Sequence, residues 1–281
     1  IAEVHNGSSL FTGDAGQGES NIRRWIIEND WLEAIVALPE NMFYNTGIAT
    51  YIWLLSNRKS LERKGKVQLI DASGWFVPLR KNLGKKNCAF SEEHIQKIAD
   101  LVINPRETEQ SKIFPNEAFG YHKITVERPL KLKDIDPEKA YSPKEIKALV
   151  AEGKADENGI PVIKKIHKSG KADPLHGLFG RTIGAKKCLV EYEQDSNLRD
   201  TEQVPLLEEG GIEAFFKREV LPYVADAWID ESKTQIGYEV SFTRYFYKPV
   251  QMRTLDEIVK DIRAIEKETD GLLNDIVGDG K

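Results

Sequence analysis

Short apolar runs and one amphipathic segment dominate the first part of the chain. The runs 34–38 and 48–55 predict strands, and the first of them is typical of a strand buried on both faces. A third strand, 66–71, is predicted to form a hairpin with 48–55 at the edge of a sheet. Segment 19–30 has helical spacing. The apolar residues on its predicted inner face are Ile22, Trp25, Ile26 and Ile27.

Further along the chain, the polar and apolar spacing predicts three more helices. Segment 91–104 begins at a serine cap, and segment 142–153 begins with serine, proline and a glutamate three residues after the cap. Segment 211–221 is amphipathic and stops at a proline. Residues 121–130 predict an exposed strand or an extended connection, and 187–193 predict a strand.

A long helix is predicted near the end of the chain. Thr254 and Glu257 form a capping box at its start. Its apolar residues recur at alternating spacings of three and four, which is a heptad seam interrupted by Thr269. Such a narrow seam predicts a partner helix, either in this chain or in another. The apolar seam residues are Leu255, Ile258, Ile262, Ile265, Leu272 and Ile276.

The composition excludes several classes of protein. The chain is 40% hydrophobic and 30% charged, as in ordinary globular proteins, and no apolar run approaches the roughly 20 residues that span a bilayer. Its two cysteines lie far apart, which argues against a disulfide scaffold or a zinc ribbon and suits a reducing cytosol. The five histidines have no ligand spacing, so we expect no metal.

The charge is unevenly distributed. The net charge is −5, yet residues 58–86 carry nine basic and two acidic residues, and residues 161–187 carry seven basic residues and one acidic residue. These stretches would suit a polyanion, or they are simply solvated loops, and both interpretations stay open. The sequence pI of about 5.7 argues against strong autonomous binding to DNA.

Two segments are candidates for ligand chemistry. A loop with Gly13, Gly16 and Gly18 precedes a helix, but its spacing is GxxGxG and not the GxGxxG of dinucleotide sites, which favours a plain loop over a nucleotide site. Phe43 and Tyr44 lie in a polar loop after a buried strand, where α/β proteins place ligands. The two aromatic residues would either stack on a base or pack in the core.

Four segments in this order resemble the methylation subunit of bacterial type I restriction-modification systems, an adenine-N6 DNA methyltransferase. The segments are residues 19–48, 64–79, 111–130 and 237–247. The resemblance implies a Rossmann-like domain that binds S-adenosylmethionine and holds the flipped adenine with an Asn-Pro-Pro-aromatic motif. That motif is not visible here, since the one Asn-Pro pair, Asn104-Pro105, is followed by Arg106. In the family, the glycine loop that binds S-adenosylmethionine and the Asn-Pro-Pro-aromatic motif both precede the segment that matches 39–48.

The chain begins with Ile1, and we expect a C-terminal portion of such a subunit, inactive alone and without bound S-adenosylmethionine. The predicted fold is α/β: the C-terminal part of a Rossmann-like S-adenosylmethionine-dependent methyltransferase sheet, followed by a mainly helical region with a long coiled-coil-like helix. We expect part of the catalytic domain over 1–133 and a charged insert or linker over 134–204. A C-terminal region over 205–281 would carry a subunit-docking helix, 254–277.

The resemblance also suggests roles for residues. It makes Phe43 and Tyr44 candidates for stacking on the target base, and the heptad seam a candidate contact for the DNA-specificity subunit. Neighbours in the aromatic loop are Asn45, Thr46 and Gly47. Candidates for contacts with DNA phosphates are Arg23, Arg24, Lys64 and Lys66. The restriction subunit and DNA are further expected partners, in a bacterial or archaeal cytoplasm. The alternatives are a non-catalytic docking module for the specificity subunit and a nucleotide-binding domain that uses the glycine loop.

Overall fold

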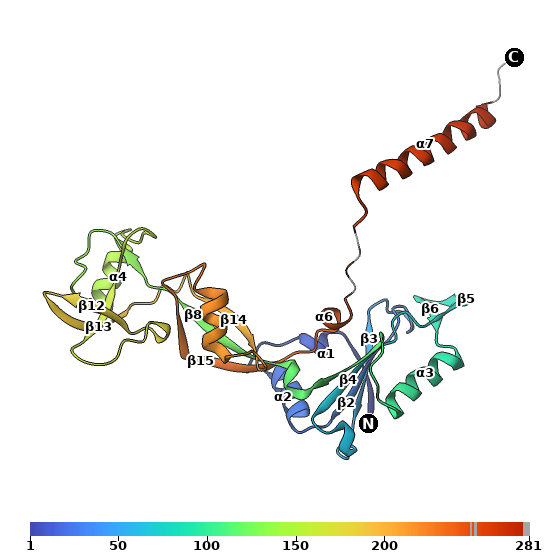
Figure 1. Cartoon of the computed structure of the whole chain (residues 1–281), viewed down its shortest axis with the longest axis horizontal. Coiled ribbons are helices and arrows are strands. Elements are labelled where there is room, and N and C mark those ends of the chain that lie inside the picture. Colours follow the sequence, from blue (N-terminus) through green and yellow to red (C-terminus); the bar gives the residue numbers. More distant parts are fainter. Residues whose placement is uncertain (248, 250–251, 278–281) are drawn as a thin grey trace. The chain divides into compact units, whose positions relative to one another are not determined.

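The computed structural model describes residues 1–247, 249 and 252–277, with side chains described up to residue 269 (Figure 1). The chain divides into two units, Ile1–Phe242 and Thr243–Lys281. It is a mixed α/β protein with several sheets. None of the helices within the described residues has the length and apolar character needed to cross a bilayer.

A mixed five-stranded sheet forms the first part of the chain, with the strand order β1-β3-β2-β4-β7 (Figure 1). The strands are β1 (Ala2–Asn6), β2 (Leu32–Ala37), β3 (Thr50–Leu55), β4 (Lys66–Asp71) and β7 (Ser111–Pro115). Strand β3 runs antiparallel to both β1 and β2, and β2 runs parallel to β4. Strands β1, β2 and β4 therefore point the same way and end at one edge of the sheet, which we call the carboxyl edge.

The central place of β2 makes one prediction wrong. Strands β3 and β4 do not form a hairpin, because β2 lies between them and pairs with both. Five of the six residues of β2 are buried, and a strand that is apolar on both faces is best covered in the middle of a sheet. The ten residues between β3 and β4 are long enough to carry the chain past β2 to its far side.

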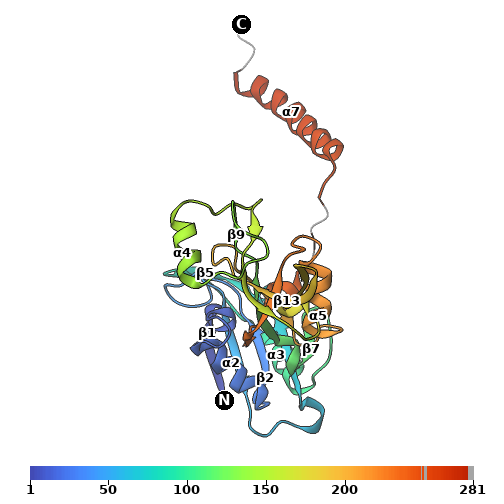
Figure 2. The same ribbon diagram turned by 90° about the vertical axis from the view of Figure 1, so that its left-hand side faces the viewer.

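At the other end of the sheet, β1 is an edge strand, and the chain begins there (Figure 2). Within the described residues β1 pairs with β3 alone. Four of its five residues are exposed, and Val4 is 50% exposed. One side of this strand therefore presents its backbone groups to solvent.

Helix α2 (Gly18–Glu28) buries a different face from the predicted one. Its buried residues are Ser20, Arg23 and Ile27, at spacings of three and four, whereas Ile22 is exposed. Trp25 is also exposed on the outer side, where its ring packs edge-to-face on Trp31 with 4.6 Å between centroids. The burial of Ile27 is as predicted, whereas the inward packing predicted for Ile22 and Trp25 is wrong. Polar residues can occupy the inner face instead when their hydrogen bonds are satisfied.

Two further helices and a hairpin lie between the strands of the first sheet in the sequence. Helix α3 (Glu92–Ile103) begins at the Ser91 cap, as predicted, and its Leu101 packs in the same core cluster as β2 and β4. Helix α1 (Ser8–Phe11) is a single short turn before α2. Strands β5 (Val77–Leu83) and β6 (Lys86–Ala89) form a separate hairpin before α3.

A second sheet has the order β14-β8-β15 (Figure 1). Its strands are β8 (Gly120–Glu127), β14 (Asp200–Pro205) and β15 (Trp228–Tyr238). The strand predicted within 121–130 is β8, but its predicted exposure is wrong, because β8 lies in the middle of this sheet with Ile124 and Val126 buried. Helix α5 (Gly211–Phe215) and the π-helical turn η4 (Phe216–Val220) cover them, as the pattern of 211–221 predicted.

A third group of elements lies between β8 and β14. It comprises β9 (Lys131–Leu132), α4 (Pro143–Ala151), β10 (Ile160–Pro161), β11 (Ile163–His167), β12 (Phe179–Ile183) and β13 (Lys186–Tyr192). The capping box of α4 and the strand near 187–193 are as predicted. Because β8, β14 and β15 come from the three predicted regions 1–133, 134–204 and 205–281, the second sheet joins all three regions.

The second unit contains α7 (Leu255–Val277) and all but the first residue of the short helix α6 (Phe242–Phe246). Helix α7 begins at the predicted capping box, where Thr254 and Glu257 exchange hydrogen bonds. The described seam residues are exposed, with Leu255 at 77% and Ile262 at 57%. The side chains of Leu272 and Ile276 lie outside the described part. The expected mainly helical region is wrong in one respect, since it also contains the eleven residues of β15.

Candidate functional site

The carboxyl edge of the first sheet brings three separate loops together. Asn6, Ala37 and Asp71 align across the sheet through their pairings with β3 and β2. The segments that follow these residues therefore leave the sheet at the same edge. In open α/β sheets, ligands bind just outside the carboxyl ends of parallel strands. This edge is the candidate functional site.

The loop after β2, residues 38–49, is held against the β5–β6 hairpin. The backbone N–H of Asn87 donates to the carbonyl of Asn41 at 3.1 Å, and the Cys88 thiol contacts the carbonyl of Glu40 at 3.2 Å. Met42 packs into the core cluster under the sheet. The loop is thus fixed at its base, and we call residues 43–47 its aromatic tip.

The aromatic tip is open to solvent. Tyr44 is 68% exposed and Phe43 is 37% exposed. Core packing is therefore not the role of Tyr44, whereas stacking on a base stays a prediction. The neighbouring residues shape the turn: Asn45 has a φ of 57°, and the Thr46 hydroxyl accepts the backbone N–H of Ile48 at 3.4 Å. A Cβ on Gly47 would lie 3.0 Å from Asn41 Oδ1, so the tip folds back on its own base.

Tyr51 and Asp71 also belong to this edge, and sequence reasoning missed them. Tyr51 lies at the start of β3, with its ring 5.1 Å from that of Phe242. Burial raises the pKa of its hydroxyl, and the nearby carboxylates of Asp71 and Glu40 raise that pKa further. Asp71 Oδ1 accepts the Ser73 hydroxyl at 2.6 Å. The missed signal was a polar residue directly after a second buried strand of the same sheet.

The four candidates for DNA-phosphate contacts do not gather around the aromatic tip. Lys64 and Lys66 are exposed, but they lie where β4 begins, at the opposite edge of the sheet. Arg24 is paired with Glu28 at 2.9 Å on α2. Arg23 is only 3% exposed, and its guanidinium donates to the carbonyls of Tyr238 at 2.7 Å and Ser9 at 3.1 Å. The structure therefore gives Arg23 a structural role and leaves no free charge there for a phosphate.

The glycine loop does not fit an adenosyl cofactor or another nucleotide. A Cβ on Gly13 would lie 2.8 Å from the Glu19 carboxylate, and one on Gly16 would lie 2.7 Å from the Gln235 side-chain oxygen. The space beside these glycines is thus filled by the chain's own side chains. Asp14 is ion-paired with Lys123 of β8, which ties the loop to the second sheet. The nucleotide-binding alternative finds no support in this geometry.

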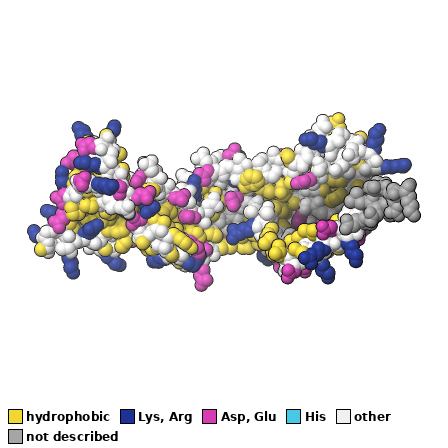
Figure 3. All heavy atoms as spheres, turned by 90° about the horizontal axis from the view of Figure 1, so that it is seen from above, with side chains coloured by type: hydrophobic (Ala, Val, Ile, Leu, Met, Phe, Trp, Pro, Cys, Tyr) yellow, Lys and Arg dark blue, Asp and Glu magenta, His cyan; other side chains and the backbone are white. Residues whose placement is uncertain are grey.

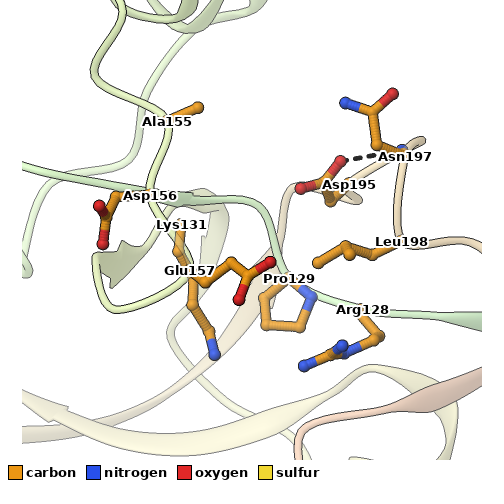
Figure 4. A pocket seen from close by; sticks show the side chains of 9 residues that line it. All are labelled: Arg128, Pro129, Lys131, Ala155, Asp156, Glu157, Asp195, Asn197 and Leu198. Carbon is orange, nitrogen blue, oxygen red and sulfur yellow. Dashed lines mark hydrogen bonds between the residues drawn. The ribbon is translucent and has the colours of Figure 1, made fainter.

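A separate cavity of about 470 Å³ lies between β8, the loop after α4 and the loop before β14 (Figure 4). Its two basic residues are already engaged. Arg128 and Lys131 both pair with Asp226, at 3.2 Å and 2.7 Å. Asp195 accepts the backbone N–H of Asn197, the bond drawn in Figure 4. Both cations share Asp226, and the lining also carries the carboxylates Asp156, Glu157 and Asp195, so this cavity is not assigned an anion.

Comparison with known proteins bears on the first part of the chain. Residues 1–120 match the family model described as N-6 DNA Methylase. The type I restriction enzyme MjaIX methylase subunit of Methanocaldococcus jannaschii is 40% identical over 86 residues, which are 31% of this chain and 15% of that protein. The MjaVII methylase subunit of the same organism is 37% identical over 106 residues, 37% of this chain and 17% of that protein.

A solved structure gives a weaker likeness. The type I restriction-modification system methyltransferase subunit from Streptococcus thermophilus is 26% identical to this chain. The alignment covers 42% of this chain and 23% of that chain, with a TM-score of 0.36.

The part of the chain that matches the N-6 DNA methylase family model, residues 1–120, contains the first sheet and the aromatic tip. Its curated relatives are methylase subunits of type I restriction enzymes, which confirms the resemblance expected from the sequence. The chain spans only 15% to 17% of the length of the two relatives described above.

Proposed function

We propose that the chain is part of the methylation subunit of a type I restriction-modification system, an enzyme that transfers a methyl group from S-adenosylmethionine to N6 of adenine in DNA. The carrying observation is the exposed aromatic tip at the carboxyl edge, within the segment that matches the N-6 DNA methylase family model. In this proposal residues 1–133 supply one wall of the target-base pocket. The groups that bind the cofactor and hold the adenine lie elsewhere in the enzyme, and the chain alone is inactive.

The role of the tip can be tested by removing one ring. Tyr44→Ala should weaken binding to a duplex with one extrahelical adenine by about 5- to 100-fold, because stacking on an aromatic ring is worth about 1–3 kcal/mol per base. Binding to a fully paired duplex should change much less. The measurement is a fluorescence-anisotropy titration of the two duplexes.

Tyr223 is a matched control, since it is also a highly exposed tyrosine in the first unit. Tyr223→Ala should leave both affinities unchanged. If Tyr44→Ala binds both duplexes as the unaltered chain does, Tyr44 does not stack on the base.

The same proposal gives α7 a partner, the DNA-specificity subunit. The exposed apolar residues of its seam support a helix-to-helix contact, because a heptad seam is stable when a second helix covers it. In this proposal the restriction subunit joins the same complex, and the contact of this chain runs through α7.

We expect the chain to co-purify with the specificity subunit of its own system. Ile262→Asp combined with Ile265→Asp should weaken that association by about 100-fold or more, because two charges would be buried in the contact. Lys260→Asp is the control, since it adds an aspartate on the opposite side of the heptad. Equal binding of the double variant and the control in a pull-down would contradict the docking proposal.

A further inference from the structure

We propose that the β5–β6 hairpin contacts the DNA backbone and holds the duplex beside the aromatic tip. This inference rests on the proposed function, since it names the surface through which the same site would hold its substrate. The four phosphate candidates from the sequence do not surround Tyr44, whereas the turn of this hairpin contacts Tyr44 and Asn45 through Gly84.

The hairpin carries one sign of charge. Its basic residues are Arg80, Lys81, Lys85 and Lys86. No acidic residue occurs between Asp71 and Glu92 in the sequence. Three of the four cations are exposed, and Lys86 is half-buried. Seven extended residues, the length of β5, are about 20 Å long. Duplex DNA carries about a dozen charges over that distance.

These four cations are also unengaged. Within the part of the chain that the structure describes, none of them forms an ion pair with a carboxylate. Two basic residues at the opposite edge of the sheet are paired instead: Lys59 with Asp30 at 2.5 Å and Arg63 with Glu33 at 3.1 Å. Free cations at an exposed site keep their charge available for an outside anion, whereas paired ones do not.

The turn of the hairpin packs directly against the aromatic tip. Gly84 begins its two-residue turn with a φ of 60°, a conformation that glycine adopts without steric cost. A Cβ at this position would lie 3.0 Å from the Tyr44 ring and would overlap Asn45 Oδ1. The pairing of β5 with β6 is irregular between Pro78 and Leu83, the stretch that contains Arg80 and Lys81. Such an irregularity in strand pairing changes the direction in which the side chains of the stretch point.

The second basic stretch of the chain, residues 161–187, differs in its surroundings, because acidic side chains of β13 and the residue after it contact two of its side chains. Lys164 pairs with Glu193, and His167 contacts Glu191 at 2.5 Å. In Figure 3 the left-hand end, where α4, β12 and β13 lie, shows basic and acidic side chains mixed over the surface. The charges there partly cancel one another, so this region serves as a comparison surface for the test.

The test measures the affinity for a duplex with one extrahelical adenine between about 50 and 200 mM salt. The slope of log K against log salt is negative, and each lost phosphate contact reduces its magnitude by about 0.9. The hairpin variant replaces Arg80, Lys81, Lys85 and Lys86 with glutamine. The control variant replaces Lys164, Lys165, Lys168 and Lys171 with glutamine. The magnitude of the slope should fall by about 3–4 in the hairpin variant and by less than about 1 in the control variant.

A further variant, Gly84→Val, keeps all four charges but places a side chain against Tyr44 and Asn45. It should leave the slope unchanged and lower the preference for the extrahelical adenine about 5-fold, because stacking at the tip is disturbed. The quadruple variants are compared after their denaturant midpoints are shown to equal that of the unaltered chain. Gly84→Val also strains the backbone at a φ of 60°, so its binding is compared per folded molecule.

Equal losses of slope in the two quadruple variants, or none in the hairpin variant, would overturn the hairpin contact. So would the absence of binding by the unaltered chain at about 50 mM salt. The two results on the salt slope leave the proposed function standing, because that function is tested separately by the effect of Tyr44→Ala on the extrahelical adenine and by docking to the specificity subunit.

Discussion

Asp30→Asn should lower the free energy of unfolding by about 2–4 kcal/mol at pH 7, because it leaves the ammonium of Lys59 buried without a counter-charge. The Lys59 side chain is only 2% exposed, and its Nζ lies 2.5 Å from Asp30 Oδ1. Asp30 also accepts the backbone N–H of Gly65 and the Asn116 amide, both at 3.0 Å. Chemical denaturation followed by circular dichroism measures the difference.

The same effect should depend on pH in one direction. Burial favours the neutral form of Asp30, but the Lys59 ammonium and the N–H donors of Gly65 and Asn116 outweigh it, and the pKa of Asp30 is lowered. A carboxyl group with a lowered pKa stabilises the fold above its unfolded pKa of about 3.9 and loses that contribution as the pH falls through its folded pKa. The difference between the two proteins should therefore be full at pH 7 and shrink in acid below about pH 4.

Asp134→Asn is the matched control. Asp134 shares with Asp30 a positive φ, 53° against 58°, but it is exposed. Asparagine tolerates this backbone conformation as aspartate does, so the control isolates the charge from the backbone. If both variants unfold at the same denaturant concentration, the buried pair of Asp30 and Lys59 does not stabilise the protein.

Arg23→Met should cost about 2–3 kcal/mol, because two buried carbonyl oxygens lose a charged donor while the apolar stem of the side chain is kept. These carbonyls belong to Tyr238 of β15 and Ser9 of α1, so the guanidinium joins α2 to both elements. Ser20 adds a second link between α2 and β15, since its hydroxyl accepts the N–H of Tyr238 at 3.1 Å. The loss would appear as a lower denaturant midpoint.

Arg24→Met provides the comparison on the same helix, since the exposed pair of Arg24 and Glu28 is worth less than about 1 kcal/mol. DNA affinity per folded molecule should be unchanged in Arg23→Met. An unchanged denaturant midpoint together with weaker DNA binding would contradict the structural role of Arg23 and would favour its contact with a DNA phosphate.

Short-range signals predicted the parts of the fold that depend on neighbouring residues. The helices that begin at Ser91, Ser142 and Thr254 were found because a cap is made within four residues of sequence. Strand β2 was found because a continuous apolar run has few other uses. The position of β4 beside β2 was missed, because periodicity does not specify which strands pair.

The candidate site was predictable to a similar degree. A loop after a buried strand placed Phe43 and Tyr44 at the carboxyl edge, as the structure shows. The burial of Arg23 was not predictable from α2, since its partner Tyr238 lies 215 residues away. The contact of Gly84 with Tyr44 likewise depends on how two distant segments pack, and no pattern of residues in the sequence predicts it.

The open side of β1 affects how the chain behaves in solution. Unpaired N–H and C=O groups along an edge strand form a template on which another extended chain can add by main-chain hydrogen bonding. Proteins often prevent this with lysine, proline or a bulge, whereas β1 carries a single charged residue, Glu3, and no proline. Concentrated samples therefore favour strand-to-strand aggregation, and the unfolding of the Asp30 and Arg23 variants is best compared in dilute solution.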